Sequence, residues 1–485
     1  MYHDLDLFIG GTWRAAKDGA TRSVTDPATE AALGTIAMAT EEDIDAALDA
    51  ARAGFDKWRR VGTWDRAALL RRTAEIIRER VDTIATLMSL ETGKPLAEAK
   101  GETNAAADQF EWYSEETKRI YGQIIEGRTG DSRMSVIYQP VGVVAAFSAW
   151  NFPALLPARK IAAALGAGCS IIIKPAGEAP ASCAALVVAC HDAGILPGAV
   201  NFLTGNSSLI AERLIRSPIV RKVSVTGSVP VGKDILRLAA DGVKKVSMEL
   251  GGHGPVVIFD DVDAEAVART CAATKFRNCG QVCISPTRFY VHESQYDVFS
   301  KAFAEVAKGL KLGRGLDDGV QMGPMANRRG LAGIEEMVED AVGLGASVLA
   351  GGARPTSMNA GYFFEPTVLG QVPDQAKVMR EEPFGPIAPI TTFRDYDEVM
   401  ERANALPFGL AGYVFSNNLS LATRASEDLE VGMVGVNEML LATAEAPFGG
   451  IKESGMGREG GSLGLMDYLN PKYIKTRIEP VDGAA

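Results

Sequence analysis

The sequence predicts an α/β protein in which a Rossmann-like parallel sheet is followed by a second α/β domain. From about residue 141, short apolar runs alternate with segments of helical spacing. Strands that alternate with helices imply right-handed crossovers and a parallel sheet. The chain has 485 residues, which is more than one hydrophobic core accommodates, so we expect two large domains with smaller appendages.

Two helical segments are predicted ahead of this alternation. Thr40 and Asp43 have the spacing of a capping box, which marks the start of a helix. Apolar residues then recur at helical spacing: Ile44, Leu48, Ala51, Phe55 and Trp58. Residues 65–90 repeat this pattern, which predicts helix there as well. Both segments are interpreted as packing elements.

The alternating region itself supplies the predicted sheet. Strands are predicted over residues 143–147, 171–173, 200–203, 223–225 and 246–248. Helices are predicted between them, over residues 158–165, 181–193, 207–215 and 231–240. After Gly252 the second α/β region begins with a strand over 255–259. Ligands of such sheets bind beyond the carboxyl ends of the strands, so candidate site residues are sought there.

A strand-rich appendage is predicted from two segments outside the alternation. Residues 120–138 interrupt the pattern with glycine and polar residues. The C-terminal stretch 468–477 is the expected partner of this segment.

Composition excludes several classes of protein. A net charge of −11 argues against nucleic acid or an anionic membrane as a partner. No apolar run approaches the ~18 residues that a membrane span requires. Six cysteines make no disulfide framework for so long a chain, and the absence of CxxC and HExxH motifs argues against a metal site. We therefore expect a cytoplasmic protein without a metal.

Cys283 stands at the end of a polar, glycine-containing segment, residues 275–283. The cysteines before residue 272 fit the common class of buried structural thiols, and the role of Cys279 stays open. A thiol that attacks a carbonyl needs a nearby base and donors for the oxyanion that forms. Glu249, in the phrase Glu-Leu-Gly-Gly at a predicted strand end, is a candidate base, although its spacing alone also fits a glutamate that faces solvent.

These two phrases, together with Asn151 before Phe-Pro, resemble the aldehyde dehydrogenase superfamily over nearly the whole chain. The resemblance implies that Cys283 is the nucleophile and that Asn151 donates its amide to the oxyanion. It also implies that Glu249 activates water against a thioester, for which an apolar setting would raise its pKa towards neutrality. The intact set of three argues against a decayed structural relative, and Glu249 argues against an acyl-CoA-forming one.

The same resemblance implies a division of the chain. Residues 1–119 and 140–252 would form an NAD(P)-binding domain, and residues 253–450 would form the catalytic domain with the cysteine. Residues 120–139 and 464–485 would form a β arm that joins subunits into a homodimer or homotetramer.

Two glycine-rich motifs suggest nucleotide binding by their letters. Residues 455–460 satisfy GxGxxG, yet no strand precedes them and too little chain follows for a βαβ unit, so we reject this motif. Residues 227–233 look like a phosphate loop, but Asp234 stands where a Ser or Thr must reach Mg²⁺. A P-loop-like nucleotide triphosphatase is kept as an alternative from another class. The loop fits better as a pyrophosphate-binding turn at a helix N-terminus.

The resemblance assigns NAD or NADP to this loop and its surroundings. The residues implied to bind the cofactor are Trp150, Lys174, Gly177, Gly227, Ser228, Gly232, Leu250, Glu382 and Phe384. Strongly NAD-preferring relatives carry a glutamate at the position of Gly177, where a carboxylate would bind the ribose hydroxyls and repel a 2′-phosphate. Glycine leaves room for the phosphate beside Lys174, whereas Glu178 could compensate, so the preference stays open.

Arg159 and Arg277 indicate the substrate. An arginine usually makes a surface ion pair, but succinate-semialdehyde dehydrogenases, which this chain resembles, carry arginine at both matching positions. A guanidinium can bind a carboxylate through two parallel hydrogen bonds. We therefore expect an ω-semialdehyde acid such as succinic semialdehyde. The 2-oxoglutarate semialdehyde dehydrogenases share both arginines and remain an alternative, as does a broad-range aldehyde dehydrogenase.

Overall fold

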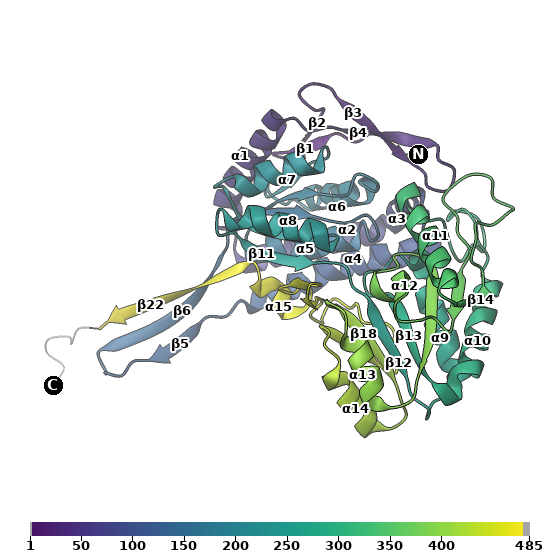
Figure 1. The fold of residues 1–485 in the computed structure, drawn as a ribbon. Helices are drawn as coiled ribbons and strands as arrows, with labels where there is room; N and C mark the ends of the chain where they lie inside the picture. Colours follow the sequence, from purple (N-terminus) through teal and green to yellow (C-terminus); the bar gives the residue numbers. More distant parts are fainter. Residues whose placement is uncertain (1, 479–485) are drawn as a thin grey trace.

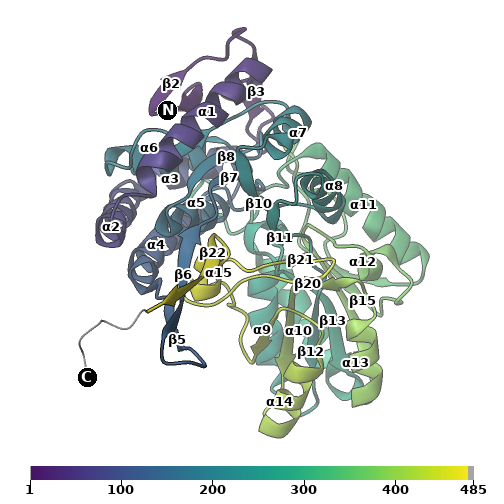
Figure 2. The ribbon, with the colours of Figure 1, turned by 90° about the vertical axis from the view of Figure 1, so that its left-hand side faces the viewer.

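The computed structural model describes residues 2–478, which form two α/β bodies and a β arm that extends away from them (Figure 1). Each body is built on its own sheet, one of eight strands and one of seven. A view turned by 90° separates the two bodies, with the strands of the second sheet below those of the first (Figure 2).

The eight-stranded sheet forms the core of the first body. In spatial order its strands are β2 (Thr12–Arg14), β1 (Leu7–Ile9), β9 (Val200–Phe202), β8 (Ser170–Lys174), β7 (Val143–Phe147), β10 (Val220–Thr226), β11 (Lys245–Glu249) and β21 (Gly455–Met456). The central strands β9 to β11 run parallel and match the five predicted strands, which confirms the Rossmann-like prediction.

Beyond the five predicted strands, the sheet is antiparallel at both edges. β1 pairs antiparallel with β9, and β21 pairs antiparallel with β11. β1 and β2 form a hairpin through Gly10 and Gly11, which both adopt positive φ (64° and 95°). No crossover helix separates strands joined by so tight a turn, so they run antiparallel.

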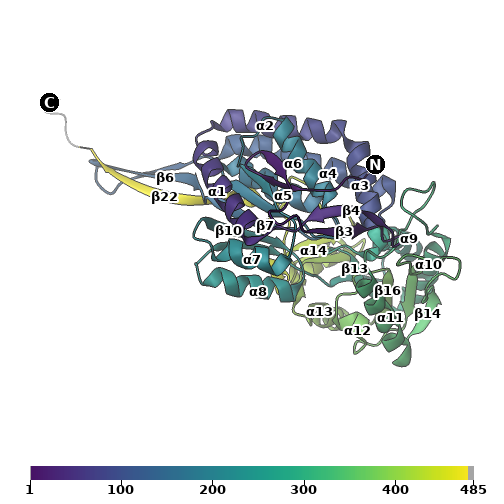
Figure 3. The ribbon, with the colours of Figure 1, turned by 90° about the horizontal axis from the view of Figure 1, so that it is seen from above.

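Two layers of helices sandwich this sheet (Figure 3). One layer comprises α1 (Glu41–Trp58), α7 (Ser207–Arg216) and α8 (Val229–Ala240), and the other α2 (Thr63–Glu79), α3 (Val81–Thr92), α4 (Leu96–Glu116), α5 (Leu155–Ala167) and α6 (Ala181–Asp192). Side chains of β7 alternate between them, with Val143 and Ala145 in the core of the first layer and Val144 and Ala146 in that of the second. Because β7 is buried on both faces, its sequence is a continuous run of apolar residues.

The N-terminal helices were predicted in part. Thr40 and Asp43 form the predicted capping box at the start of α1, with both reciprocal hydrogen bonds present. The helical prediction over 65–90 is confirmed apart from one break, where Arg80 leaves the helical conformation (φ −106°, ψ 15°) and separates α2 from α3. Both helices pack against α4 and α6, and the bend at Arg80 lets the apolar stripe follow that surface.

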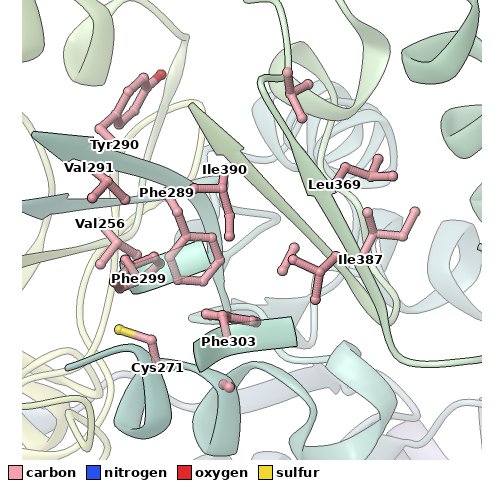
Figure 4. Packing of buried hydrophobic residues seen from close by; sticks show 14 of the residues in the cluster. Val256, Cys271, Phe289, Tyr290, Val291, Phe299, Phe303, Leu369, Ile387 and Ile390 are labelled. Atoms are coloured by element: carbon pink, nitrogen blue, oxygen red, sulfur yellow. The ribbon is translucent and has the colours of Figure 1, made fainter. Parts of the chain in front are cut away.

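The seven-stranded sheet forms the second body. Its strands in spatial order are β14 (Ser347–Ala350), β15 (Thr367–Gly370), β16 (Ile387–Phe393), β13 (Pro286–His292), β12 (Gly254–Ile258), β18 (Ala411–Phe415) and β19 (Met433–Val436). β12 is the strand predicted over 255–259. Phe289 of β13 packs against Phe299 and Phe303 of α10 (Tyr296–Gly309), with ring centroids 6.2 Å and 5.0 Å apart (Figure 4).

The chain reaches the candidate nucleophile through α9 (Ala264–Lys275), which packs against α10. Cys271 of α9 lies in the same apolar core (Figure 4). The remaining elements are β3 (Thr21–Thr25), β4 (Ala32–Ala37), α11 (Arg328–Gly343), α12 (Lys377–Arg380), α13 (Tyr396–Asn404), β17 (Phe408–Gly409), α14 (Leu419–Asp428), β20 (Ile451–Lys452) and α15 (Gly461–Met466), with short 3₁₀ turns at Thr117–Arg119, Arg277–Gly280 and Glu293–Gln295.

The arm consists of β5 (Gln123–Glu126), β6 (Ser132–Pro140) and β22 (Leu469–Arg477). β6 lies in the middle and pairs antiparallel with both neighbours, so the segment after residue 120 meets the C-terminal stretch. Figures 1 and 3 show the arm extending beyond the two bodies. Of the predicted arm segment 464–485, residues 479–485 lie outside the described residues. Within residues 2–478, no helix has both the length and the apolar character that a membrane crossing requires.

Candidate active site

Cys283 follows a turn of three consecutive left-handed residues. Asn278, Cys279 and Gly280 have φ values of 49°, 56° and 71°. Residues with a side chain rarely adopt this region, and such strain concentrates at functional sites. A methyl group on Gly280 would lie 2.1 Å from the carbonyl oxygen of Gly385, so only glycine fits there.

Hydrogen bonds from both bodies hold this turn. The backbone N–H of Asn278 donates to Glu98 of α4 at 2.8 Å, and its side-chain amide donates to the carbonyl oxygens of Asn151 and Gln281 at 3.0 Å and 3.1 Å. The side-chain amide of Gln281 donates back to the Asn278 carbonyl at 3.1 Å and accepts from the N–H of Ala326 at 2.9 Å. The loop that carries Cys283 is therefore fixed before a substrate arrives.

Cys283 is the one partly exposed cysteine in the described part of the chain, and the other five are buried. Burial of the site, followed by the charge of Glu249, raises the pKa of the Cys283 thiol to about 12, while Arg159 opposes the rise. The thiol is therefore protonated at neutral pH and needs a proton acceptor before it can attack. Cys279 instead points to Met325, with the two sulfur atoms 3.7 Å apart.

Glu249 is the last residue of β11 and is buried, with 4% of its surface exposed. Neither carboxylate oxygen has a hydrogen-bond partner among residues 2–478. The nearest cation is Arg159, with Nη1 3.8 Å from Glu249 Oε2. Burial, with the charge of Glu459 added, raises the pKa of Glu249 to about 8, and Arg159 works against this rise. An unpartnered carboxyl group with a pKa near neutrality suits a general base.

A buried ion pair next to Glu249 is absent from the sequence predictions. Lys160 of α5 donates to Glu459, and Ser224 of β10 lies within hydrogen-bond distance of both. The negative charge of Glu459 is the second cause of the raised pKa of Glu249. Lys160 and Glu459 are 299 residues apart, and the only local signal is that Lys160 follows Arg159.

Asn151 is buried and contacts the loop that carries Cys283. Its side-chain amide donates one hydrogen to the carbonyl of Gln281 at 3.1 Å. An asparagine amide carries two hydrogens, so one remains available to an oxyanion. The ammonium group of Lys94 donates to the Asn151 carbonyl at 3.0 Å, and Glu102 accepts from the backbone N–H of Ala154 at 2.9 Å. The segment before α5 is therefore held by α4 and by the residues just before it.

A cavity of about 450 Å³ lies at the carboxyl ends of β8 and β10. Phe147, Val225 and Ile235 form part of its apolar wall. Two hydroxyl groups that line it, Ser148 Oγ and Thr226 Oγ1, are buried and have no hydrogen-bond partner in the described part of the chain. Apolar walls with a few unsatisfied polar atoms, at this edge of a parallel sheet, fit a dinucleotide.

The predicted phosphate-binding loop leads into α8 beside this cavity. Ser228 is the N-cap residue of α8, and a methyl group on Gly227 before it would meet only Val231 Cγ1, at 3.9 Å. A methyl group on Gly232 would lie 2.5 Å from Leu250 Cδ1, so Gly232 allows close packing of α8 on the loop after β11. Lys233 forms an ion pair with Glu453 at 2.8 Å on the surface, which disfavours a P-loop role for its ammonium group.

The other predicted cofactor residues occupy two places. Lys174 and Gly177 line the cavity. Glu382 accepts a hydrogen bond from the backbone N–H of Gly252 at 3.1 Å, and burial raises its pKa to about 8. The rings of Trp150 and Phe384 meet edge to face, with their centroids 5.6 Å apart.

Arg159 and Arg277 reach the surroundings of Cys283 from different elements. The guanidinium of Arg159 lies over the ring of Phe448 at 3.9 Å, in addition to its contact with Glu249. The guanidinium of Arg277 lies 5.4 Å from the ring centroid of Phe152. Phe152 packs in a small apolar cluster with Val282, the neighbour of Cys283.

A second cavity of about 450 Å³ lies between α4, α5 and the loop 442–445. Arg159, Leu155 and Trp112 line it. Leu155 belongs to the same apolar cluster as Val282, so this cavity lies close to the loop of Cys283. Its lining also includes the carboxylates of Asp108, Glu111, Glu115 and Glu445, so Arg159 is the single cation among the lining residues. Residues 2–478 hold no cluster of three metal-ligating side chains.

The comparisons with known proteins agree with this geometry. The model of the aldehyde dehydrogenase family matches residues 13–474. Glutarate-semialdehyde dehydrogenase of Pseudomonas putida is 44% identical over 467 residues, 96% of each chain. Succinate-semialdehyde dehydrogenase [NADP(+)] of Escherichia coli is 43% identical over 477 residues, 97% of this chain and 98% of the relative.

Solved structures give the same result for the fold. The crystal structure of succinate-semialdehyde dehydrogenase from Burkholderia pseudomallei superposes with a TM-score of 0.96 at 41% identity, covering 98% of each chain. Fold, family model and full-length relatives therefore agree, and the chain belongs to the aldehyde dehydrogenase family.

Proposed function

We propose that this aldehyde dehydrogenase oxidises an ω-semialdehyde acid, such as succinic semialdehyde, to the dicarboxylate with NAD or NADP as oxidant. The observation that carries the proposal is the placement of Arg159 and Arg277 beside the loop of Cys283. The two similar proteins are named for glutarate and succinate semialdehydes, and each of these is a short aldehyde that ends in a carboxylate.

The first chemical step is addition of the Cys283 sulfur to the aldehyde carbon. A carbon–sulfur bond forms, the carbonyl oxygen takes the negative charge, and the thiol proton leaves to solvent water. The remaining amide hydrogen of Asn151 and the backbone N–H of Cys283 serve as donors to the oxyanion. Losing one such donor typically costs ~3 kcal/mol of transition-state stabilisation.

Oxidation then leaves a thioester on Cys283. When bound, the nicotinamide accepts the hydride that the aldehyde carbon loses as the oxyanion collapses. Glu249 next takes a proton from a water molecule, whose oxygen attacks the thioester carbon. The carbon–sulfur bond breaks, the acid leaves, and the thiol of Cys283 regains its proton. The raised pKa of Glu249 matches the task of accepting a proton from water near neutral pH.

The function is tested by following reduced cofactor with succinic semialdehyde, glutaric semialdehyde, 2-oxoglutarate semialdehyde and propanal, each with NAD and with NADP. We expect kcat/KM for at least one acid-bearing aldehyde to exceed that for propanal by on the order of 100-fold, because an arginine–carboxylate pair forms only with the acid. A preference for propanal would contradict the proposal that the substrate carries a carboxylate. Inactivity of all four would remove the proposed function itself.

Replacing Arg277 by alanine is expected to damage turnover selectively. With a carboxylated aldehyde, kcat/KM should fall by ~30-fold or more, since truncating one partner of a buried charge pair typically costs 2–5 kcal/mol. Propanal oxidation should change by less than about threefold, because a neutral substrate has no charge to pair. Arg277→Lys keeps the charge without the paired donors and should lie between the two. Equal losses on both substrates would mean that Arg277 is structural.

Assembly through the β arm is proposed as well, as a homodimer or homotetramer. Ile124, Ile137 and Tyr473 are exposed on the arm. Apolar side chains that are exposed together often mark a surface that another protein covers. We expect Ile124→Asp to reduce the mass measured by sedimentation velocity. Leu419→Asp, which changes an equally exposed leucine on α14, should leave it unchanged. A monomeric unsubstituted protein would contradict the assembly.

A cytoplasmic location also remains a proposal. The six free cysteines support it, because unpaired thiols are typical of reducing compartments. Localisation of the tagged protein by cell fractionation would test it, and recovery outside the cytoplasm would contradict it.

A further inference from the structure

Arg22 lies beside Gly177, at the Lys174 end of the cavity formed at the carboxyl ends of β8 and β10. Arg22 belongs to β3, which pairs with β4 as a two-stranded sheet separate from the two large ones. A methyl group on Gly177 would lie 1.7 Å from Arg22 Nη2 and 2.8 Å from Arg22 Cζ. The guanidinium therefore fills the space that any side chain at position 177 would need.

Arg22 and Lys174 act on each other as two cations. The ammonium group of Lys174 donates to Ser207 Oγ at 2.6 Å, at the start of α7. Burial lowers the pKa of Lys174 to about 8, the charge of Glu178 opposes this, and the charge of Arg22 lowers it further. Neither cation forms an ion pair with a carboxylate within residues 2–478. An anion placed between them would relieve their repulsion.

Three carboxylates line the same cavity, and two of them are already paired. Glu212 accepts from Arg216 at 3.0 Å, and Asp234 accepts from Arg237 at 2.5 Å. The third, Glu178, is exposed to solvent, where its charge is screened. Glu178 nonetheless acts on Lys174 more strongly than Arg22 does, so two cations and one exposed carboxylate leave a net positive charge at the Lys174 end.

We propose that Arg22, together with Lys174, binds the 2′-phosphate of NADP and makes this chain prefer NADP to NAD. The inference rests on the proposed use of a nicotinamide dinucleotide. A guanidinium offers two parallel N–H donors to a phosphate, and an ammonium adds a compact charge. Gly177 contributes by carrying no side chain, because a carboxylate there would both neutralise Arg22 and repel the phosphate.

Binding without turnover tests this proposal. Dissociation constants for NADP, NAD and adenosine 2′,5′-bisphosphate are measured by calorimetric titration of the unsubstituted protein and of Arg22→Ala, Arg22→Lys and Arg60→Ala. Arg60 is an exposed arginine just after α1 and serves as the matched control. Its neighbour Trp58 donates a hydrogen bond to the carbonyl of Leu165, just before the amino end of β8, whereas the cavity lies at the carboxyl end of that strand. The bisphosphate isolates the adenosine end from the nicotinamide.

The expected result for Arg22→Ala is a tenfold or greater weakening of NADP and of the bisphosphate, with less than a twofold change for NAD. Arg22→Lys should recover part of the loss, and Arg60→Ala should change none of the three constants. Unchanged NADP binding in Arg22→Ala, or equal weakening of NADP and NAD, would overturn the proposal. Failure of both dinucleotides to bind the unsubstituted protein would instead remove the proposed function on which it rests.

Gly177→Glu provides the reciprocal test. The new carboxylate would meet the flexible end of Arg22, which can move aside and pair with it. We expect NADP binding to weaken by tenfold or more while NAD binding is kept or improved. Retention of the original NADP affinity by this variant would contradict the assignment, even if Arg22→Ala weakened binding.

Discussion

Replacing Cys283 by alanine is expected to abolish aldehyde oxidation, with a loss of at least ~10⁴-fold in kcat, because no other group can form the thioester. The fold should survive, since the partly exposed side chain contributes little to a hydrophobic core. Reduced-cofactor absorbance measures the loss, and circular dichroism checks the fold.

Cys279→Ala is the matched control for this prediction. Cys279 is buried, and its sulfur lies 3.7 Å from that of Met325 rather than among the candidate catalytic groups. We expect this variant to keep turnover within about threefold while losing some stability through the small cavity it leaves. Turnover above background in Cys283→Ala would contradict the assignment of Cys283 as the nucleophile. So would a loss of turnover in Cys279→Ala alone.

Replacing Glu249 by glutamine is expected to separate oxidation from hydrolysis. Cys283 should still be acylated once, giving a burst of reduced cofactor close to one equivalent per site. Steady turnover should then fall by ~10²–10⁴-fold, the contribution typical of a general base. Rapid-mixing absorbance measures both phases. Wild-type steady turnover in this variant would contradict the role of Glu249.

The raised pKa of Glu249 predicts a pH dependence with a definite sign. The active form is the carboxylate, and burial holds its pKa at about 8, above the usual value of 4.5. Where hydrolysis limits the rate, turnover should therefore rise from pH 6 towards pH 8 and level off above it. Residual turnover of Glu249→Gln should lack this rise. A rate already constant from pH 6 upward would contradict the raised pKa.

The first sheet could be predicted because burial on both faces leaves few alternatives. A continuous apolar run such as 143–147 between amphipathic segments is explained by a parallel strand covered by helices, and β7 is such a strand. The start of α1 was equally local, since its capping box needs only Thr40 and Asp43. The bend at Arg80 could not be predicted, because packing on α4 and α6 sets it and no local helix breaker marks it.

The candidate site could be predicted from the sequence only where its residues stand in short, recognisable motifs. Cys283, Glu249 and Asn151 stand in recognisable motifs; Asn151 contacts the loop of Cys283, and the charge of Glu249 acts on the Cys283 thiol. The left-handed turn at Asn278 depends on Glu98, 180 residues earlier in the chain. The contact of Arg22 with Gly177 likewise joins segments that no periodicity relates. Such features follow from the packing of distant elements.

The most direct test of the account is to trap the thioester. Glu249→Gln is mixed with succinic semialdehyde and NADP, quenched in acid during the burst, and digested for peptide mass spectrometry. The account predicts that the peptide containing Cys283 gains the mass of the succinyl group and that the sulfur of Cys283 carries it. Reduced cofactor formed with an unmodified Cys283 peptide would contradict covalent catalysis by this residue.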